Sequence, residues 1–244
     1  MCTVTYVPQG KNHFILTSNR DENSARSPKN ITVTQDSQQR LAFPRDTAAG
    51  GTWIAISGKD KLVCLLNGAF VRHNRRPSYR PSRGLMVLDF FAFPKATHFF
   101  SQYQFEDMEP FTMIIYDQGQ LFDLRWDEQQ KHIRKLDIDH FHIWSSATLY
   151  GPEAQEKRIK WFNQWREAQK KYPSRENILD FHRHAGEGDP WNDVVMNRNG
   201  LVQTVSITSI EKTPATIDMQ YHDLLNQQTK NTKIKLQGEA LGSR

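Results

Sequence analysis

The N-terminal segment has the pattern of a β-hairpin, and this pattern constrains the start of the fold more than any other feature of the chain. Cys2–Val7 alternates and is rich in β-branched residues, and His13–Asn19 has the composition of a second strand. Proline, glycine and asparagine occur between them, in 8–12, which is typical of a turn. A four-residue loop over 9–12 predicts a register in which Cys2 lies opposite Asn19.

Cys2 directly follows the initiator Met1. Removal of Met1 would give this one residue both a thiol and a free α-amino group. The amine titrates near ~7.7–8.0 and a free thiol near ~8.5, so both groups are poised close to neutral pH. A nucleophile that uses its own N-terminal amine as base is a known variant of the catalytic triad. The sequence therefore predicts Cys2 as a candidate catalytic nucleophile.

The polar run after the second strand suits this chemistry. In the predicted register Arg20 and Asp21 lie beside and diagonal to the sulfur of Cys2, within side-chain reach. Arg20 is expected to hold the sulfur as thiolate by charge, and Asp21 to accept a hydrogen bond from the α-ammonium group. The alternative interpretation is that Cys2 is a small hydrophobic residue at the start of an edge strand, beside a surface cluster of ion pairs.

Four further short blocks follow in order along the chain. They are Gly50–Ile54, which opens a strand and contains Trp53; Leu66-Asn67 at the end of an apolar strand; Ser82–Leu85 at the start of a helix; and Ser145–Ala147 in a turn before another helix. A polar residue such as Asn67 at a strand end is a common position for a functional side chain.

Together with Met1-Cys2 and Asn19–Glu22, these blocks resemble the NRDE family, also called the Transport and Golgi organisation 2 family. The family is in turn similar to N-terminal-nucleophile hydrolases of the bile-salt hydrolase and penicillin V acylase type. The resemblance implies an α+β fold, a four-layer αββα sandwich of two antiparallel sheets. It also implies that Asn67 helps to bind the oxyanion of an acyl substrate.

The sequence departs from the family pattern at two positions. Ser146 stands where family members usually have an asparagine, which contributes to the oxyanion hole in the related acylases. An arginine that members often carry near Gln203 is absent. Removal of one oxyanion donor lowers the rate by on the order of 10²–10³. The resemblance therefore supports the fold more strongly than the activity.

The predicted ligand is a small molecule, and an anionic one is favoured by the arginines that follow Asn67. Arg72 begins this run, which also contains Arg75, Arg76, Arg80 and Arg83, in a chain of net charge +5. A solvated loop is the alternative, and no recognisable nucleic-acid-binding motif accompanies the arginines, so no nucleic-acid partner is predicted. Asn19, Trp53, Ser146 and Arg72 are the residues expected to contact the substrate.

Composition and the order of elements favour one domain. The 244 residues contain no linker-like stretch, and strands followed by helices and then strands indicate α+β layers. A single domain is predicted over 1–221, with a peripheral tail over 222–244 that is rich in lysine and ends in Gly-Ser-Arg.

Two cysteines exclude a disulfide framework, and Cys64, in an apolar strand, is predicted to be an inert buried thiol. The histidine pairs at 140 and 142 and at 182 and 184 lack a familiar zinc spacing, so neither a metal nor a cofactor is predicted. The sequence has no apolar run long enough to cross a membrane, and a cytoplasmic location is expected. The oligomeric state does not follow from the sequence.

Two functions from different classes remain open at this stage. The first is an amidohydrolase in which mature Cys2 attacks a linear C–N amide. The second is a binding or trafficking protein on the same scaffold, which the family resemblance associates with haem or lipid-metabolite handling. A fold alone does not decide between them.

Overall fold

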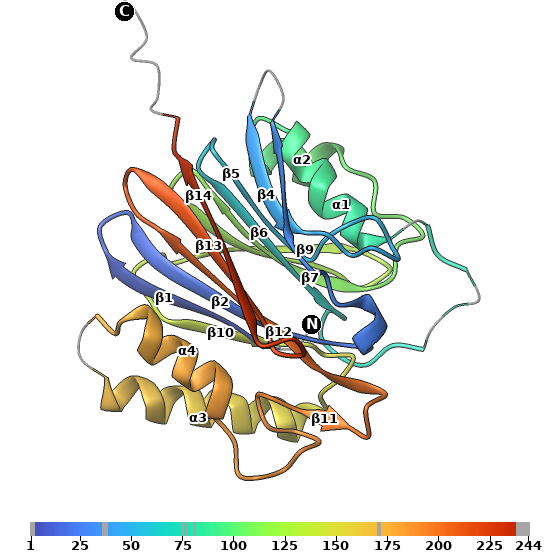
Figure 1. Ribbon diagram of the computed structural model, residues 1–244. Helices are drawn as coiled ribbons and strands as arrows, with labels where there is room; N and C mark the ends of the chain where they lie inside the picture. Colours follow the sequence, from blue (N-terminus) through green and yellow to red (C-terminus); the bar gives the residue numbers. More distant parts are fainter. Residues whose placement is uncertain are drawn as a thin grey trace, which may run out of the picture.

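The chain forms two antiparallel β-sheets that stack face to face (Figure 1). The computed structural model describes residues 3–35, 39–74, 76, 78–80, 82–169 and 172–237. The first sheet has the order β10-β1-β2-β12-β13-β14, with β11 paired to β12. Its strands are β1 (Thr3–Gly10), β2 (His13–Glu22), β10 (His142–Ser145), β11 (Asn197–Arg198), β12 (Val202–Lys212), β13 (Thr216–Asp223) and β14 (Gln228–Lys235).

The second sheet follows the chain order without a crossover. Its strands are β3 (Ile31–Gln35), β4 (Arg40–Pro44), β5 (Ile54–Ser57), β6 (Lys61–Asn67), β7 (Phe111–Asp117), β8 (Gln120–Trp126) and β9 (Lys131–Leu136). The meander arises because each connection is a hairpin or an excursion that returns to the neighbouring position, and consecutive antiparallel strands pair most readily.

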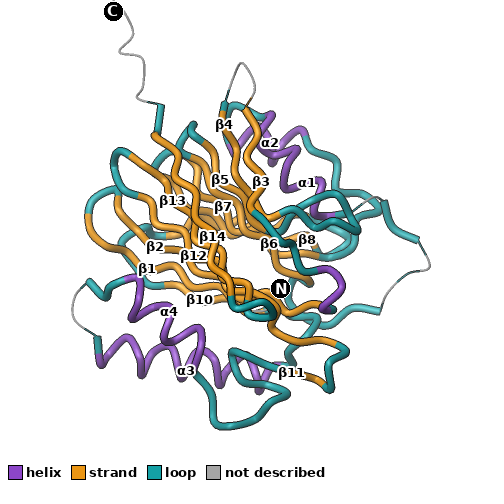
Figure 2. Tube along the Cα trace, viewed as in Figure 1, coloured by secondary structure: helices purple, strands orange, loops and turns teal. Residues whose placement is uncertain are grey.

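Helices cover the outer faces of both sheets (Figure 2). The helices α1 (Arg83–Asp89) and α2 (Ala96–Gln102), with the short 3₁₀ helix η2 (Phe90–Ala92), cover the second sheet, whereas α3 (Pro152–Ala168) and α4 (Arg175–His184) cover the first. A second 3₁₀ helix, η1 (Ser24–Arg26), follows β2. The predicted four-layer αββα sandwich is confirmed.

Three apolar clusters hold the layers together. Leu16 and Ile54 belong to the cluster between the two sheets, Phe99 to the cluster under α1 and α2, and Phe162 and Phe181 to the cluster under α3 and α4. Each of these side chains is at most 4 % exposed. Full burial of such a side chain contributes about 1.5–3 kcal/mol, so every layer has its own favourable contact.

The N-terminal hairpin forms as predicted, but in a register shifted by one residue. Thr3 pairs with Asn19, and the turn is tighter than expected because Gly10 pairs with His13 across a bulge. Asn12 in this turn has a positive φ of 54°, which asparagine tolerates better than most residues. The partner of Asn19 is therefore Thr3 and not Cys2, which lies outside the described residues.

The C-terminal segment also differs from its prediction. Residues 222–237, expected within a peripheral tail, complete β13 and form the edge strand β14, which pairs with β13 from Thr216↔Lys235 to Asp223↔Gln228. Ile234 is 2 % exposed and belongs to the cluster between the sheets. Apart from Ile234, the residues of β14 are lysine and other polar residues, which suits an exposed edge strand.

Candidate functional site

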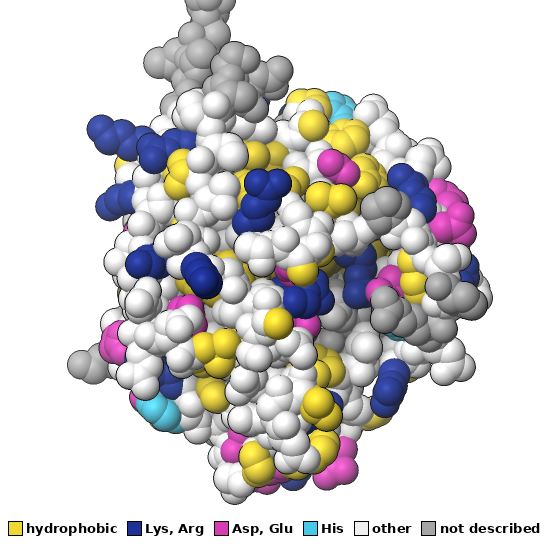
Figure 3. Space-filling model, turned by 45° about the vertical axis from the view of Figure 1, so that its right-hand side comes forward, with side chains coloured by type: hydrophobic (Ala, Val, Ile, Leu, Met, Phe, Trp, Pro, Cys, Tyr) yellow, Lys and Arg dark blue, Asp and Glu magenta, His cyan; other side chains and the backbone are white. Residues whose placement is uncertain are grey.

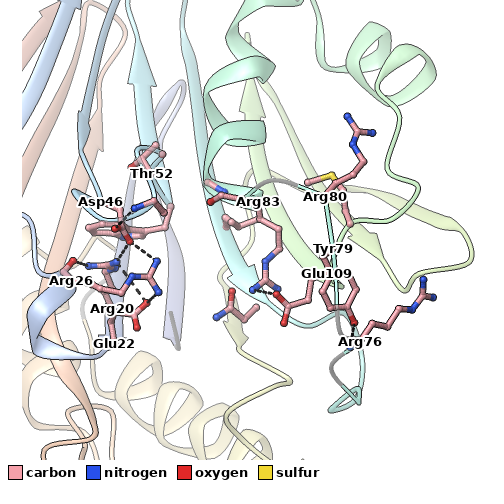
Figure 4. A pocket seen from close by; sticks show the side chains of 18 residues that line it. Arg20, Glu22, Arg26, Asp46, Thr52, Arg76, Tyr79, Arg80, Arg83 and Glu109 are labelled. Atoms are coloured by element: carbon pink, nitrogen blue, oxygen red, sulfur yellow. Dashed lines mark hydrogen bonds and ion pairs between the residues drawn. The ribbon is translucent and has the colours of Figure 1, made fainter.

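A cavity of about 390 Å³ opens at one end of the interface between the sheets. Its walls come from five regions: the end of β2 with η1, the segment before β5, the end of β6, the loop that leads into α1, and the segment just before β7. Lys and Arg side chains lie in the recessed centre of one face of the molecule (Figure 3). The labelled side chains of the cavity form two groups that face each other, Arg20 with Arg26, Glu22 and Asp46 on one side and Arg83 with Glu109 on the other (Figure 4).

The end of β2 divides its polar residues between two faces. Successive side chains of a strand point to opposite sides, so Arg20 and Glu22 line the cavity, whereas Asn19 faces the helices. The amide of Asn19 donates hydrogen bonds to the carbonyls of His182 and Val194, both at 3.0 Å. Asn19 is thus bonded on the helix side of the sheet and does not line the cavity, and its predicted contact with substrate stays a prediction.

Arg20 belongs to a buried ion cluster. Its guanidinium donates to Asp46 Oδ2 at 2.7 Å and to the carbonyl of Arg26 at 2.6 Å, and it is 3 % exposed. Arg26 donates to the same Asp46 oxygen at 2.6 Å and to Glu22 at 2.8 Å. Burial lowers the pKa of Arg20 below its ordinary value. The charge of Arg20 is therefore shared with carboxylates, which leaves less of it for a neighbouring thiolate.

Sequence reasoning missed two residues of this cluster, Arg26 and the carboxylate that joins it to Arg20, Asp46. Burial alone would raise the pKa of its carboxyl, but a backbone hydrogen bond from Ala49 and the charges of Arg20 and Arg26 hold the pKa below its ordinary value. Asp46 therefore stays ionised near neutral pH. Its position just before Gly50-Gly51 was the only local signal, because the partner Arg20 lies 26 positions earlier in the chain.

Trp53 forms the floor of the cavity beside this cluster. The guanidinium carbon of Arg20 lies 4.0 Å from the centroid of the Trp53 ring, within the range of a cation–π contact. Trp53 is 4 % exposed, and its indole N–H has no hydrogen-bond partner within the described residues. A buried unpaired donor costs stability, so this N–H is a candidate contact for a ligand.

The start of α1 is held against the segment that contains Trp53 by close backbone contact. The amide of Thr52 donates to the carbonyl of Gly84 at 3.0 Å, and Ser82 caps the helix by accepting from the Gly84 amide at 3.2 Å. A Cβ atom on Gly51 would lie 2.3 Å from the carbonyl carbon of Gly84. Glycine at position 51 therefore lets two walls of the cavity meet.

Asn67 lies at the end of β6 and lines the cavity. Its side-chain amide makes no hydrogen bond to any described residue, so it is available to a ligand oxygen. Ser146, which is fully buried, donates from its hydroxyl to the backbone carbonyl of Asn67 at 2.8 Å. Ser146 thus contacts Asn67 and is absent from the cavity wall, where Trp53 and Asn67 lie.

Three arginines of the run from Arg72 to Arg83 line the cavity. Arg72 is exposed and does not line the cavity, whereas Arg76, Arg80 and Arg83 do. Arg83 pairs with Glu109 at 2.9 Å and Arg76 with Glu128 at 3.3 Å. Over the described lining, five arginines stand against three carboxylates, which gives the cavity an excess of positive charge.

Asp21 lies on the helix side of β2, on the same face as Asn19. Its two carboxylate oxygens accept hydrogen bonds from Thr204 at 2.6 Å and from Tyr150 at 2.8 Å. The structure describes Asn19, Arg20, Asp21, Trp53, Asn67, Arg72 and Ser146, but Cys2 lies outside the described residues. The catalytic roles assigned to Cys2, Arg20, Asp21 and Asn67, and the substrate contacts assigned to the other four residues, stay predictions.

Three further findings concern the second cysteine, metal binding and membrane spans. Burial raises the pKa of the Cys64 thiol to about 12, which keeps it protonated. Within the described ranges, no group of three or more His, Cys, Asp or Glu side chains is arranged to hold a metal ion. No helix in the same ranges is long and apolar enough to cross a membrane.

Comparison with known proteins identifies the family and the fold. The sequence profile of the family described as Transport and Golgi organisation 2 matches residues 1–239. No curated protein matches the sequence. The fold is similar to two crystal structures of conjugated bile acid hydrolase variants from Clostridium perfringens, each with a TM-score of 0.59 and 9 % identity, covering 95 % of this chain and 92 % of that one.

A third similar structure is the Caenorhabditis elegans N-acylethanolamine-hydrolyzing acid amidase ortholog. Its TM-score is 0.51 at 11 % identity, and the match covers 86 % of this chain and 92 % of that one. At these identities the likeness establishes the N-terminal-nucleophile hydrolase fold and not the activity.

Proposed function

The chain belongs to the Transport and Golgi organisation 2 family, and on this scaffold we propose that it hydrolyses a linear C–N amide with mature Cys2 as the nucleophile. The α-amine of Cys2 takes the proton of the thiol of the same residue, and the resulting thiolate attacks the amide carbonyl. The amine passes this proton to the leaving nitrogen as the C–N bond breaks, which leaves a thioester. Water then adds to the thioester and gives a proton to the amine. As the C–S bond breaks, the ammonium group returns this proton to the sulfur, which releases the carboxylic acid and regenerates the free thiol.

One observation carries the proposal: the described start of β1 lies beside the residues that build the cavity. Thr3, which follows Cys2 in the sequence, pairs with Asn19 on one side and with Ser145 on the other. The residue after Asn19 is Arg20, which lines the cavity, and the residue after Ser145 is Ser146, which bonds to Asn67. A nucleophile at the start of β1 would therefore enter a site that already carries polar groups.

Asn67 supplies the proposed oxyanion contact. Its amide has no partner within the described residues, and its backbone is held by Ser146 and by pairing with Phe111 on β7. A donor that is positioned before the reaction needs no reorganisation when charge develops on the acyl oxygen. The Ser146 hydroxyl is directed to the Asn67 carbonyl, so in this proposal it supports the donor.

The substrate we propose is an N-acyl amide with an anionic end. The excess of arginine over carboxylate in the cavity lining favours an anion through the summed field, while Trp53, Leu65 and Met108 offer apolar surface to an acyl chain. The similar structures belong to enzymes named for hydrolysis of conjugated bile acid and of N-acylethanolamine, which are amide substrates. Those names support the amide class and leave the acyl group of this chain's substrate to experiment.

The test combines intact mass with turnover. Mass spectrometry of the natively expressed protein should show loss of Met1, and retained Met1 would refute the mechanism at once. N-acyl amino acids, which are anionic, should then be hydrolysed faster than neutral N-acyl ethanolamides, with kcat/KM falling as salt is raised. Cys2→Ala should abolish turnover, and Cys64→Ala serves as the control because Cys64 is buried away from the cavity.

A different result would support the second function. If Cys2 is mature and reactive but no acyl amide in the panel is hydrolysed, the amidohydrolase proposal fails. Titration with haem and with acylated metabolites would then test the binding or trafficking role.

A further inference from the structure

A fully buried arginine lies beneath the start of β1. Arg158, on α3, is 0 % exposed. Its guanidinium donates to Thr3 Oγ1 at 3.2 Å, to the carbonyl of Ala154 at 3.0 Å and to the carbonyl of Asp193 at 3.0 Å. None of these acceptors is charged, and Arg158 forms no ion pair with any carboxylate in the described part of the chain. Burial of a charge without a counter-ion is costly, so we expect the guanidinium of Arg158 to have a specific function in this position.

Arg158 also contacts the aromatic ring of Tyr150, which in turn is hydrogen-bonded to Asp21. The guanidinium carbon of Arg158 lies 3.5 Å from the centroid of the Tyr150 ring, and that of Arg198 lies 5.5 Å from it. Tyr150 is 1 % exposed, and its hydroxyl donates to Asp21 Oδ2 at 2.8 Å. Cations near the ring make the phenol a stronger hydrogen-bond donor, because they stabilise electron density that is withdrawn from the O–H.

Each carboxylate oxygen of Asp21 accepts a hydrogen bond from a side chain. Thr204 donates to one carboxylate oxygen and Tyr150 to the other, and the residue is 3 % exposed. Thr3 is fully buried, and its hydroxyl accepts from Arg158. One pair of side chains, Tyr150 and Arg158, therefore contacts both Asp21 and the residue that is covalently joined to Cys2.

We propose that Tyr150 and Arg158 are positioning residues for the N-terminal nucleophile, which they orient from below through Asp21 and Thr3. This inference rests on the proposed function, in which Asp21 accepts a hydrogen bond from the α-ammonium group of Cys2. Arg158 fixes the backbone at Thr3, and Tyr150 fixes the carboxylate. Neither residue lines the cavity, so neither contacts the substrate.

The experiment measures the reactivity of Cys2 in the full-length protein without any substrate. Rates of alkylation by iodoacetamide are followed between pH 5 and 9, and peptide mapping by mass spectrometry separates Cys2 from Cys64. The variants are Tyr150→Phe, which removes only the hydroxyl, and the pair Arg158→Met and Arg158→Lys. The matched control is Tyr6→Phe, because Tyr6 is also buried and its hydroxyl donates to the Ile138 carbonyl at 3.0 Å, at a different place in the fold.

The wild-type profile should show a Cys2 pKa near ~7, and Tyr150→Phe should move it toward the ~8.5 of a free thiol. A complete move to ~8.5 would lower the thiolate fraction at pH 7 about 16-fold, but a thiol of higher pKa is also the better nucleophile, so the net rate at pH 7 would fall by at most about three- to fourfold. Arg158→Met should act in the same direction, Arg158→Lys should restore part of the loss, and Tyr6→Phe should leave the profile unchanged.

Two negative results have different meanings. If wild-type Cys2 has the pKa of a free thiol, or if Met1 is retained, the proposed function fails and this inference fails with it. If wild-type Cys2 is activated but Tyr150→Phe, with a melting temperature matched by Tyr6→Phe, keeps the same profile, only the positioning role is refuted.

Discussion

Replacement of Gly51 by alanine should destabilise the protein more than the same replacement at Gly50 or Gly151. The added Cβ would lie 2.3 Å from the carbonyl carbon of Gly84, 2.5 Å from its oxygen and 2.6 Å from the amide nitrogen of Leu85. Carbon atoms in contact are ordinarily about 3.5–4.0 Å apart, so the two backbones must separate by more than an ångström. The obstacle is backbone on both sides, so no side chain can rotate to relieve it.

The cost has two parts. Overpacking of this kind costs about 1–3 kcal/mol, and loss of the hydrogen bond from Thr52 N to the Gly84 carbonyl costs roughly 1 kcal/mol more. A total of about 2–4 kcal/mol corresponds to a fall in Tm of roughly 4–16 °C for a chain of this size. Thermal and urea unfolding followed by circular dichroism measure both quantities.

The other two glycines separate the steric cause from backbone strain. Gly50 has a φ of +73°, but no atom lies within 4 Å of the point that a Cβ would occupy, so Gly50→Ala should cost only the strain of a left-handed alanine, about 1–2 kcal/mol. Gly151 has a φ of −65° and open space around it, so Gly151→Ala should change stability by less than about 1 kcal/mol. If Gly51→Ala lies within about 0.5 kcal/mol of Gly151→Ala, the contact with Gly84 does not have the importance assigned to it.

Two further predictions concern pH and the oxyanion contact. Burial lowers the pKa of His182 to about 3. The unfolded chain, with an ordinary histidine pKa of ~6.5, therefore binds the proton first as pH falls, and stability drops by roughly 1.2 kcal/mol between about pH 7 and pH 5.5 from this residue alone. Urea midpoints should show that His182→Gln loses less over this interval than wild type, and an equal loss would contradict the reasoning. Asn67→Ala should lower kcat on an acyl amide by about 10²–10³ while the alkylation rate of Cys2 changes less than about twofold, and an unchanged kcat would remove Asn67 from the oxyanion role.

The local pattern of the sequence determined the elements around the site. Alternation and composition predicted the two strands of the N-terminal hairpin, and the block Ser82–Leu85 predicted a helix start, where Ser82 caps α1 by accepting a hydrogen bond from the Gly84 amide. These signals are local, because they depend on neighbours within a few positions. The two-layer sheet arrangement came from the family resemblance carried by the ordered sequence blocks, and both the profile match and the similar structures confirm it.

The local pattern did not determine the register of the N-terminal hairpin. The turn chemistry of 8–12 allows either a four-residue loop or a tighter turn with a bulge, and the structure has the bulge, which moves the partner of Asn19 from Cys2 to Thr3. A slip of one residue changes every cross-strand pair. Which face of β2 meets the helices and which meets the second sheet then decides that Arg20 lines the cavity and that Asn19 and Asp21 do not.

Tertiary structure alone decided the partners of the charged residues. Arg20 meets Asp46, and Asp21 meets Tyr150, a residue 129 positions away. Nothing near Tyr150 or Arg158 in the sequence distinguishes them from an ordinary loop tyrosine and an ordinary helix arginine. The contacts of Arg158 with Thr3 and of Tyr150 with Asp21 arise only when α3 and the segment before it pack on the first sheet, because hydrogen bonds depend on distances of a few ångströms that only the folded chain establishes.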